Sequence, residues 1–158
     1  MKRHNYRIDG GFSFEAGGNV TTLEVVYHTS PMEYQKGMKV IWICHALTAD
    51  SDAEDWWPEL VGPGKLFDTD RYFIVCANMI GSCYGSTGPS SIDSATGKPY
   101  YLTFPKVTVR DIVRGLDAVR KHIGIDKIDL LVGASIGGFQ ALEWSVMEPD
   151  VMTKAVYI

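Results

Sequence analysis

The strongest constraint on the fold is a strand–turn–helix signature between Leu130 and Gly138. An apolar run leads into a Gly-x-Ser-x-Gly turn centred on Ser135, and a helix begins directly afterwards. In such a turn the backbone passes close to its neighbours, so small residues are needed two positions either side of the serine. Gly133 and Gly137 occupy those positions. The pattern predicts a nucleophile elbow with the Ser135 hydroxyl exposed at a helix N-terminus, where developing negative charge is stabilised.

The residues on both sides of the turn support this interpretation. Ile128 and the run Leu130–Val132 follow a polar stretch, as expected for a buried parallel strand. After the turn, apolar residues recur with helical spacing until Glu148 and Pro149, where proline ends the helix; they are Ile136, Phe139, Leu142 and Met147. The alternative is a glycine-rich turn with an idle serine, which the flanking pattern disfavours.

The remaining segments predict an α/β fold. The chain has 158 residues, of which 46% are hydrophobic, enough for one domain with a substantial core. The sequence predicts a hairpin of two strands at Phe12–Glu15 and Thr21–Thr29. Buried strands are predicted at Val40–Cys44, Tyr72–Ala77 and Thr153–Ile158. A short helix is predicted at Trp56–Leu60 and a longer one at Thr108–Ile123. Thr108 with Asp111 resembles a capping box, and Gly124 fits the helix end. This order indicates a mostly parallel sheet that carries an N-terminal antiparallel hairpin.

Composition excludes several classes of function. The net charge is −4 and no basic stripe is present, which argues against a nucleic-acid partner. The apolar runs are too short to span a bilayer, and the first eleven residues do not resemble a signal peptide. Three cysteines suggest no disulfide framework, so we expect a cytoplasmic protein. No His or Cys cluster has the spacing of a metal site.

A serine nucleophile requires further groups. It needs a base, a residue that orients the base, and hydrogen-bond donors for the oxyanion of the tetrahedral intermediate. In this type of site one donor is the backbone N–H of the residue after the serine, here Ile136. The second comes from the loop after an earlier strand. We predict the Leu47 N–H, because the loop at residues 45–48 follows the predicted strand Val40–Cys44.

The base is not evident in the sequence. All four histidines precede Ser135, whereas the catalytic acid and histidine follow the serine in this architecture; they are His4, His28, His45 and His122. His45 is the one expected near Ser135, and a role in shaping the loop is favoured over a role as general base.

Three other features leave alternatives open. The paired Trp56 and Trp57 either line a pocket or anchor a loop to the core. The long segment at residues 78–101 is either functional or disordered. Within it, Cys83 lies in a glycine-rich stretch and could be accessible.

Together these motifs resemble the homoserine O-acetyltransferases, acyltransferases of the α/β-hydrolase fold. The resemblance covers nearly the whole chain and is far more specific than the serine motif alone. Its segments are His45–Thr48, Trp56–Trp57, Gly62–Lys65, Asp68–Phe73, Asn78, Gly81–Cys83, Gly85–Pro89, Phe104–Pro105, Thr108, Arg110–Asp111, Gly133–Gly138 and Leu142–Trp144. The family usually has Met after the serine, where this chain has Ile136, but a backbone donor tolerates the change.

The resemblance implies a reaction and its participants. Ser135 would attack acetyl-CoA, release CoA, and pass the acetyl group to the hydroxyl of L-homoserine in methionine biosynthesis. Leu47 and Ile136 would supply the oxyanion donors. No bound cofactor or metal is implied, and the whole enzyme would be a cytoplasmic homodimer.

The family's catalytic Asp and His, its substrate-binding Arg and its helical lid have no counterpart in this sequence. We therefore expect residues 1–158 to be the N-terminal part of a single α/β-hydrolase domain, cut after the strand that follows the nucleophile helix. Alone, this part is expected to be inactive.

Three other functions remain open. The first is an ester hydrolase of the same fold, because sequence does not show whether water is kept from the acyl-enzyme. The second is succinyl rather than acetyl transfer. The third is a non-catalytic binding module, whose open sheet edge at Thr153–Ile158 would need a partner strand.

Overall fold

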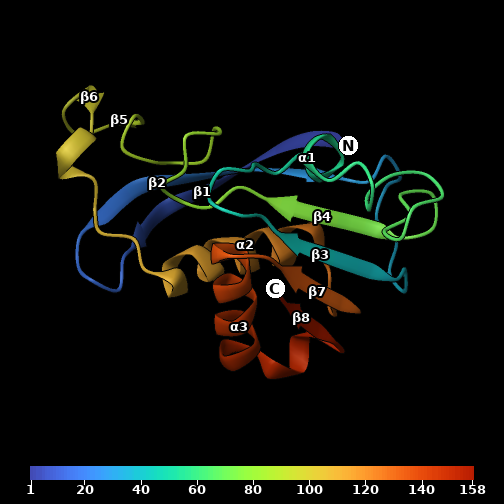
Figure 1. Cartoon of the computed structure of the whole chain (residues 1–158). Helices are drawn as coiled ribbons and strands as arrows, with labels where there is room; N and C mark the ends of the chain where they lie inside the picture. The colour runs from blue at the N-terminus through green and yellow to red at the C-terminus, as the bar shows by residue number, and fades with distance from the viewer.

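The computed structural model describes all 158 residues and contains a six-stranded mixed sheet (Figure 1). In spatial order the strands are β1 (Lys2–Ser13), β2 (Asn19–Thr29), β4 (Phe73–Ala77), β3 (Val40–Cys44), β7 (Leu130–Gly133) and β8 (Ala155–Tyr157). The first three pair antiparallel, and β4, β3, β7 and β8 run parallel. The predicted α/β-hydrolase arrangement of a hairpin and a parallel sheet is therefore confirmed.

The central strands are apolar throughout because both faces of the sheet are covered. Successive side chains of a strand point to opposite faces. In β3, Trp42 faces the larger core cluster, whereas its neighbours Ile41 and Ile43 belong to a second cluster on the other face. In β4, Val75 and Ile74 divide in the same way. A buried parallel strand is expected to show this continuous hydrophobic run.

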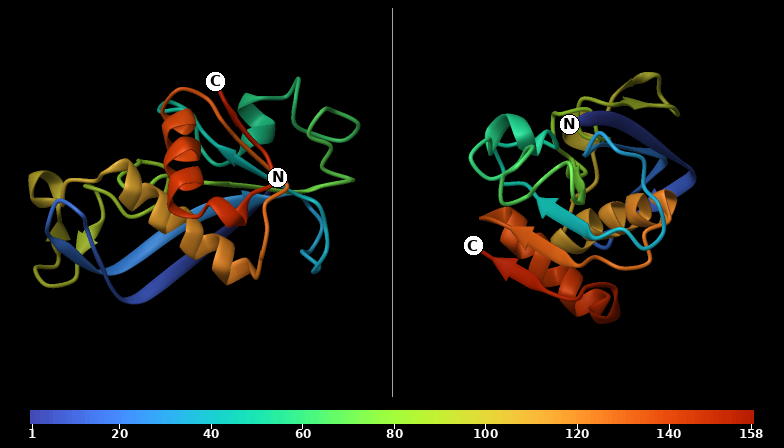
Figure 2. Two further views of the ribbon diagram at one scale, coloured as in Figure 1. Left: turned by 90° about the horizontal axis from the view of Figure 1, so that it is seen from below. Right: turned by 90° about the vertical axis from the view of Figure 1, so that its right-hand side faces the viewer.

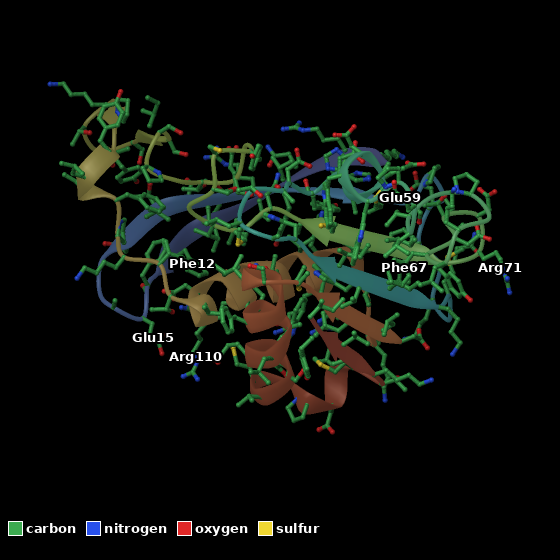
Figure 3. All side chains as sticks on the ribbon, viewed as in Figure 1. Phe12, Glu15, Glu59, Phe67, Arg71 and Arg110 are labelled. Carbon is green, nitrogen blue, oxygen red and sulfur yellow. The ribbon has the colours of Figure 1, made fainter.

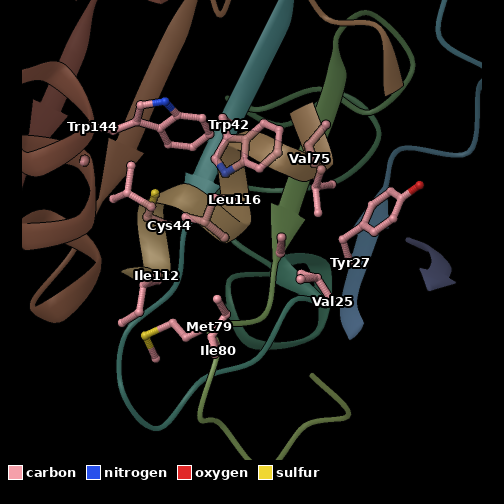
Figure 4. Packing of buried hydrophobic residues seen from close by; sticks show 14 of the residues in the cluster. Val25, Tyr27, Trp42, Cys44, Val75, Met79, Ile80, Ile112, Leu116 and Trp144 are labelled. Atoms are coloured by element: carbon pink, nitrogen blue, oxygen red, sulfur yellow. The ribbon is translucent and has the colours of Figure 1, made fainter. Parts of the chain in front are cut away.

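The two long helices, α2 (Val109–Ile123) and α3 (Ile136–Met147), cover one face of the sheet. The short α1 (Ala53–Trp56) and its loops lie over the other face (Figures 1 and 2). Beneath the long helices, Trp42 and Trp144 meet edge to face with ring centroids 5.0 Å apart (Figure 4). The remaining elements are β5 (Ile92–Asp93), β6 (Lys98–Pro99) and two 3₁₀ turns, η1 (Tyr101–Thr103) and η2 (Pro149–Val151).

The capping box predicted for α2 is present and also joins the helix to the hairpin. The Thr108 hydroxyl accepts the Asp111 N–H, while the Asp111 carboxylate accepts the Thr108 N–H. The other carboxylate oxygen of Asp111 accepts the Glu15 N–H from the β1–β2 turn. Nearby, Arg110 forms an ion pair with Glu15 (Figure 3). It forms a second ion pair with Glu143 of α3.

Two predicted boundaries were wrong. The first strand begins at Lys2 rather than Phe12, because β1 is an edge strand whose outer side faces solvent and therefore carries charged residues. Its register shifts between Asp9 and Phe12, where two glycines adopt positive φ. The short helix α1 covers Ala53–Trp56 and precedes the predicted Trp56–Leu60.

Helix α3 differs from the usual amphipathic pattern. The N-terminal half of its inner face carries the small residues Gly137, Gly138 and Ala141, because the helix lies very close to the sheet there. Nearer the other end, the buried Trp144 packs on Trp42. The apolar residues Phe139, Leu142 and Val146 are half or more exposed on its outer face. The regular spacing therefore located the helix correctly but did not indicate which side is buried.

Candidate active site

Ser135 lies in a strained elbow between β7 and α3. Its backbone has φ 57° and ψ −125°, and it is one of two non-glycine residues with positive φ. Its side chain is exposed. Such a conformation costs about 1–3 kcal/mol and is typical of functional sites. A Cβ placed on Gly133 would come within 2.0 Å of the Gly137 carbonyl oxygen, so the elbow requires glycine there.

The elbow is packed directly against the loop that follows β3. Cys44, the last residue of β3, pairs in parallel with Gly133 at the end of β7. A Cβ on Gly137 would lie 2.1 Å from the Cys44 carbonyl oxygen and 2.9 Å from that of His45. Glycine at position 137 thus brings the start of α3 against the backbone of residues 44–45.

Both predicted oxyanion donors face one cavity and lack hydrogen-bond partners. Leu47 and Ile136 line the same cavity, and neither backbone N–H donates a hydrogen bond within the chain. Ile136 is the first residue of α3, and a helix leaves its first N–H groups unpaired. The structure therefore brings Leu47 and Ile136 to one cavity, whereas Ser135, the residue before Ile136, is not among its lining residues.

The cavity measures about 730 Å³, and no charged side chain lines it. The segment at residues 79–84 forms one wall, and η1 with the residues up to Val107 forms another. Aromatic and aliphatic side chains predominate, including Met79, Tyr84, Tyr101, Phe104 and Ile112. Such a lining suits a neutral, partly apolar ligand. The long loop at residues 78–101, predicted to be functional or disordered, is ordered and contributes much of this wall.

His45 is fully buried, and both of its ring nitrogens contact backbone groups. Nδ1 lies 2.8 Å from the Ala46 carbonyl oxygen, and the Met79 N–H donates to Nε2 at 3.3 Å. Nε2 must therefore be unprotonated, which leaves the proton on Nδ1. Burial also lowers the pKa of His45, which favours the neutral ring. This geometry agrees with the predicted role in shaping the loop and leaves no nitrogen free to act as a base.

The other three histidines do not line the cavity. His28 Nδ1 lies 2.8 Å from the Ser51 hydroxyl. His4 stacks on Tyr27, and His122 stacks on Tyr6 with ring centroids 3.9 Å apart. These contacts belong to the hairpin, the sheet and α2, so no histidine of this chain is a candidate base for Ser135.

The role of the segment from Gly85 to Pro89 was missed from sequence. Strand β2 pairs with β4 only at Tyr27–Thr29, so on this side its earlier residues have no neighbouring strand, although β1 pairs with them on the other side. The Glu24 N–H donates to the Thr87 hydroxyl at 2.8 Å, and the Val26 N–H donates to the Ser86 hydroxyl at 3.1 Å. These bonds attach the cavity wall to the sheet. They join residues about sixty positions apart, so no local pattern indicated them.

The structure also decides whether Trp56 and Trp57 line a pocket or anchor a loop to the core. Trp56 and Trp57 stack with ring centroids 5.3 Å apart, and Trp57 packs edge-on against Phe67. The Trp56 indole N–H donates to the Asp50 carbonyl at 2.9 Å. Neither residue lines the large cavity. The pair anchors the loop after β3 to the second core cluster.

Cys83 should be the thiol that reacts in the native protein. It is exposed and lines the cavity, whereas burial raises the pKa of both Cys44 and Cys76. Because the thiolate is the reactive form, iodoacetamide should alkylate Cys83 before the two buried thiols. Peptide mapping after brief labelling of the native protein measures this order. Earlier labelling of Cys44 or Cys76 would contradict the prediction.

The sheet order and the strand–turn–helix elbow at Ser135 define an α/β-hydrolase scaffold. The profile of the alpha/beta hydrolase fold family matches residues 39–158, and the chain belongs to this family. Within it, the chain is similar to homoserine O-acetyltransferases. It is 43% identical to that of Methanosalsum zhilinae over 96% of this chain and 32% of the relative.

Solved structures give the same fold and include two activities. Homoserine O-acetyltransferase from Bacillus anthracis superposes with a TM-score of 0.84 at 29% identity, over 98% of this chain and 46% of that protein. An acetylester hydrolase from Corynebacterium glutamicum has a TM-score of 0.83 at 25% identity, over 97% and 42% respectively. The chain thus spans less than half of the proteins it resembles. No helix in the structure combines the length and apolarity needed to cross a membrane.

Proposed function

We propose that the whole protein transfers an acetyl group from acetyl-CoA to the hydroxyl of L-homoserine, through an acyl-serine intermediate at Ser135. The observation that carries the proposal is the strained, exposed Ser135 directly before Ile136. Ile136 lines one cavity with Leu47, and the backbone N–H groups of both residues are unpaired. Homoserine O-acetyltransferases at 43–44% identity support the choice of the acetyl group and of homoserine as its acceptor. Such a reaction would serve methionine biosynthesis.

In the first step, the Ser135 oxygen bonds to the thioester carbon while a base removes the hydroxyl proton. The two N–H groups stabilise the oxyanion, and the C–S bond then breaks to release CoA. In the second step, the homoserine hydroxyl attacks the acyl-serine ester and regenerates Ser135. The base is assigned to a part of the whole protein outside this chain, since both nitrogens of His45 are engaged.

Ester hydrolysis is the second candidate, and the similarity to an acetylester hydrolase favours it. The two activities share the acyl-enzyme and differ in what attacks it.

The deciding experiment measures the intact mass of the whole protein after brief incubation with acetyl-CoA alone. A gain of one acetyl group that maps to Ser135 is expected. Homoserine should then remove the adduct with formation of O-acetylhomoserine, whereas rapid loss to acetate in buffer alone would identify a hydrolase. Absence of any adduct during continuing turnover would contradict an acyl-serine mechanism.

The proposed compartment is the cytoplasm. Its support is the presence of three free cysteines and no disulfide, as expected where thiols stay reduced. The homodimer implied by the family resemblance stays a prediction for the whole protein.

A further inference from the structure

Two consecutive peptide units of the loop after β3 are held by side chains. A peptide unit is planar and trans, so its C=O and its N–H point in opposite directions. Fixing the carbonyl of one residue therefore fixes the direction of the next residue's N–H. The unit of interest joins Ala46 to Leu47, because its N–H is the proposed oxyanion donor.

The peptide unit between Ala46 and Leu47 is fixed by the His45 ring. The Ala46 carbonyl accepts hydrogen bonds from His45 Nδ1 at 2.8 Å and from the Ala49 N–H at 3.1 Å. Held from these two sides, the carbonyl sets the plane of the unit. The Leu47 N–H on its opposite side then points away from both donors and makes no bond within the chain. The Met79 N–H secures the far side of the ring at 3.3 Å.

The peptide unit between His45 and Ala46 is contacted by Gln140 of α3. The side chain of Gln140 is fully buried, and its Nε2 lies 3.4 Å from the His45 carbonyl oxygen. Because a carbonyl only accepts hydrogen bonds, this contact also assigns the amide orientation. Gly137, one turn earlier, packs against the same carbonyl. The nucleophile helix therefore touches the loop that carries the second donor.

Gln140 is a costly residue to bury at this place. Its Oε1 has no hydrogen-bond partner, and an unpaired buried carbonyl costs about 1–3 kcal/mol. A methionine of similar shape would fill the space without that penalty. Stability therefore does not explain why a glutamine stands at position 140. Its single hydrogen bond, to the backbone of the oxyanion loop, does explain it.

We propose that Gln140 and His45 are positioning residues that together aim the Leu47 N–H toward the site shared with Ile136, through hydrogen bonds to the His45 and Ala46 carbonyls. This inference rests on the proposed acyl-enzyme chemistry. Neither side chain touches substrate. They preorganise a donor, which is the feature that makes an oxyanion hole effective.

The test is Gln140→Met in the whole protein, with acylation by acetyl-CoA followed in single turnovers by rapid quench and intact mass. Removing one oxyanion donor slows catalysis by about 10²–10³-fold, so a misaimed donor should slow maximal acylation by about tenfold. The acetyl-CoA concentration at half-maximal rate should not change. The melting temperature should stay the same or rise, because the unpaired carbonyl is gone.

Ser145→Ala is the matched control. Ser145 lies on the same helix, where its hydroxyl donates to the Ala141 carbonyl at 2.8 Å, away from the loop. The acylation rate of the Ser145→Ala variant should equal that of the wild type. An unchanged rate in Gln140→Met would overturn the positioning role, as would a loss of rate that parallels a loss of stability.

Gln140→Glu gives an independent readout if the methionine variant folds poorly. A protonated carboxyl can donate to the His45 carbonyl, whereas the ionised form only repels it. Its acylation rate relative to wild type at each pH should therefore rise as the pH falls. A constant ratio would count against the proposal. If the wild-type protein itself forms no acyl-enzyme, the proposed function fails first, so the two failures are distinguishable.

Discussion

Replacing Ser135 with alanine in the whole protein is expected to lower the rate of homoserine acetylation by at least about 10⁴-fold. The hydroxyl oxygen is the atom that forms the acyl bond, and alanine carries no nucleophilic atom in its place. Residual activity from the cavity and the oxyanion donors alone should stay far below wild type. Steady-state CoA release with acetyl-CoA and homoserine measures the effect.

A second substitution at this position separates chemistry from folding. Alanine keeps a Cβ and therefore the strain of φ 57°, so its free energy of unfolding should match wild type. Glycine relieves the strain and should raise the free energy of unfolding by about 1 kcal/mol or more, while remaining as inactive as alanine. Ser145→Ala serves as the active control. Substantial turnover in Ser135→Ala would exclude this serine as the nucleophile.

The elbow was predictable because its requirements are local. Close packing at Gly133 and Gly137 and an exposed serine between them follow from five consecutive residues and the strand before them. The same holds for α2, whose capping box needs only Thr108 and Asp111. Sequence reasoning also assigned Leu47 and Ile136 to one site, since parallel strands end at the same edge of a sheet.

The features that sequence reasoning missed depend on contacts distant in the chain. The hydroxyls of Ser86 and Thr87 bond to amides of β2, and Gln140 reaches the carbonyl of His45 across 95 positions. Strand β1 was predicted too short because an edge strand tolerates charged residues, which hides its alternation. Such pairings become visible only when the backbone positions are known.

Gly137→Ala is expected to produce a large loss of stability. Its Cβ would lie 2.1 Å from the Cys44 carbonyl oxygen and 2.8 Å from the carbonyl carbon. Both are backbone atoms of β3, so no side-chain rotation relieves the overlap, and α3 must move away from the sheet. Overpacking of this kind costs about 3 kcal/mol or more, and urea unfolding of the whole protein should show it.

Gly138→Ala provides the comparison that makes this prediction specific. It is the next residue of the same helix, and its nearest contact would be the Ile158 carbonyl oxygen at 3.2 Å. A helical alanine gains about 1 kcal/mol over glycine, which offsets a shift of a few tenths of an ångström. The free energy of unfolding should therefore stay within about 1 kcal/mol of wild type. Equal effects at the two positions would contradict the conclusion that the contact with β3 requires glycine at 137. Because that contact also places Ile136 opposite the loop of Leu47, Gly137→Ala should slow acylation as well, even at temperatures where the variant is folded.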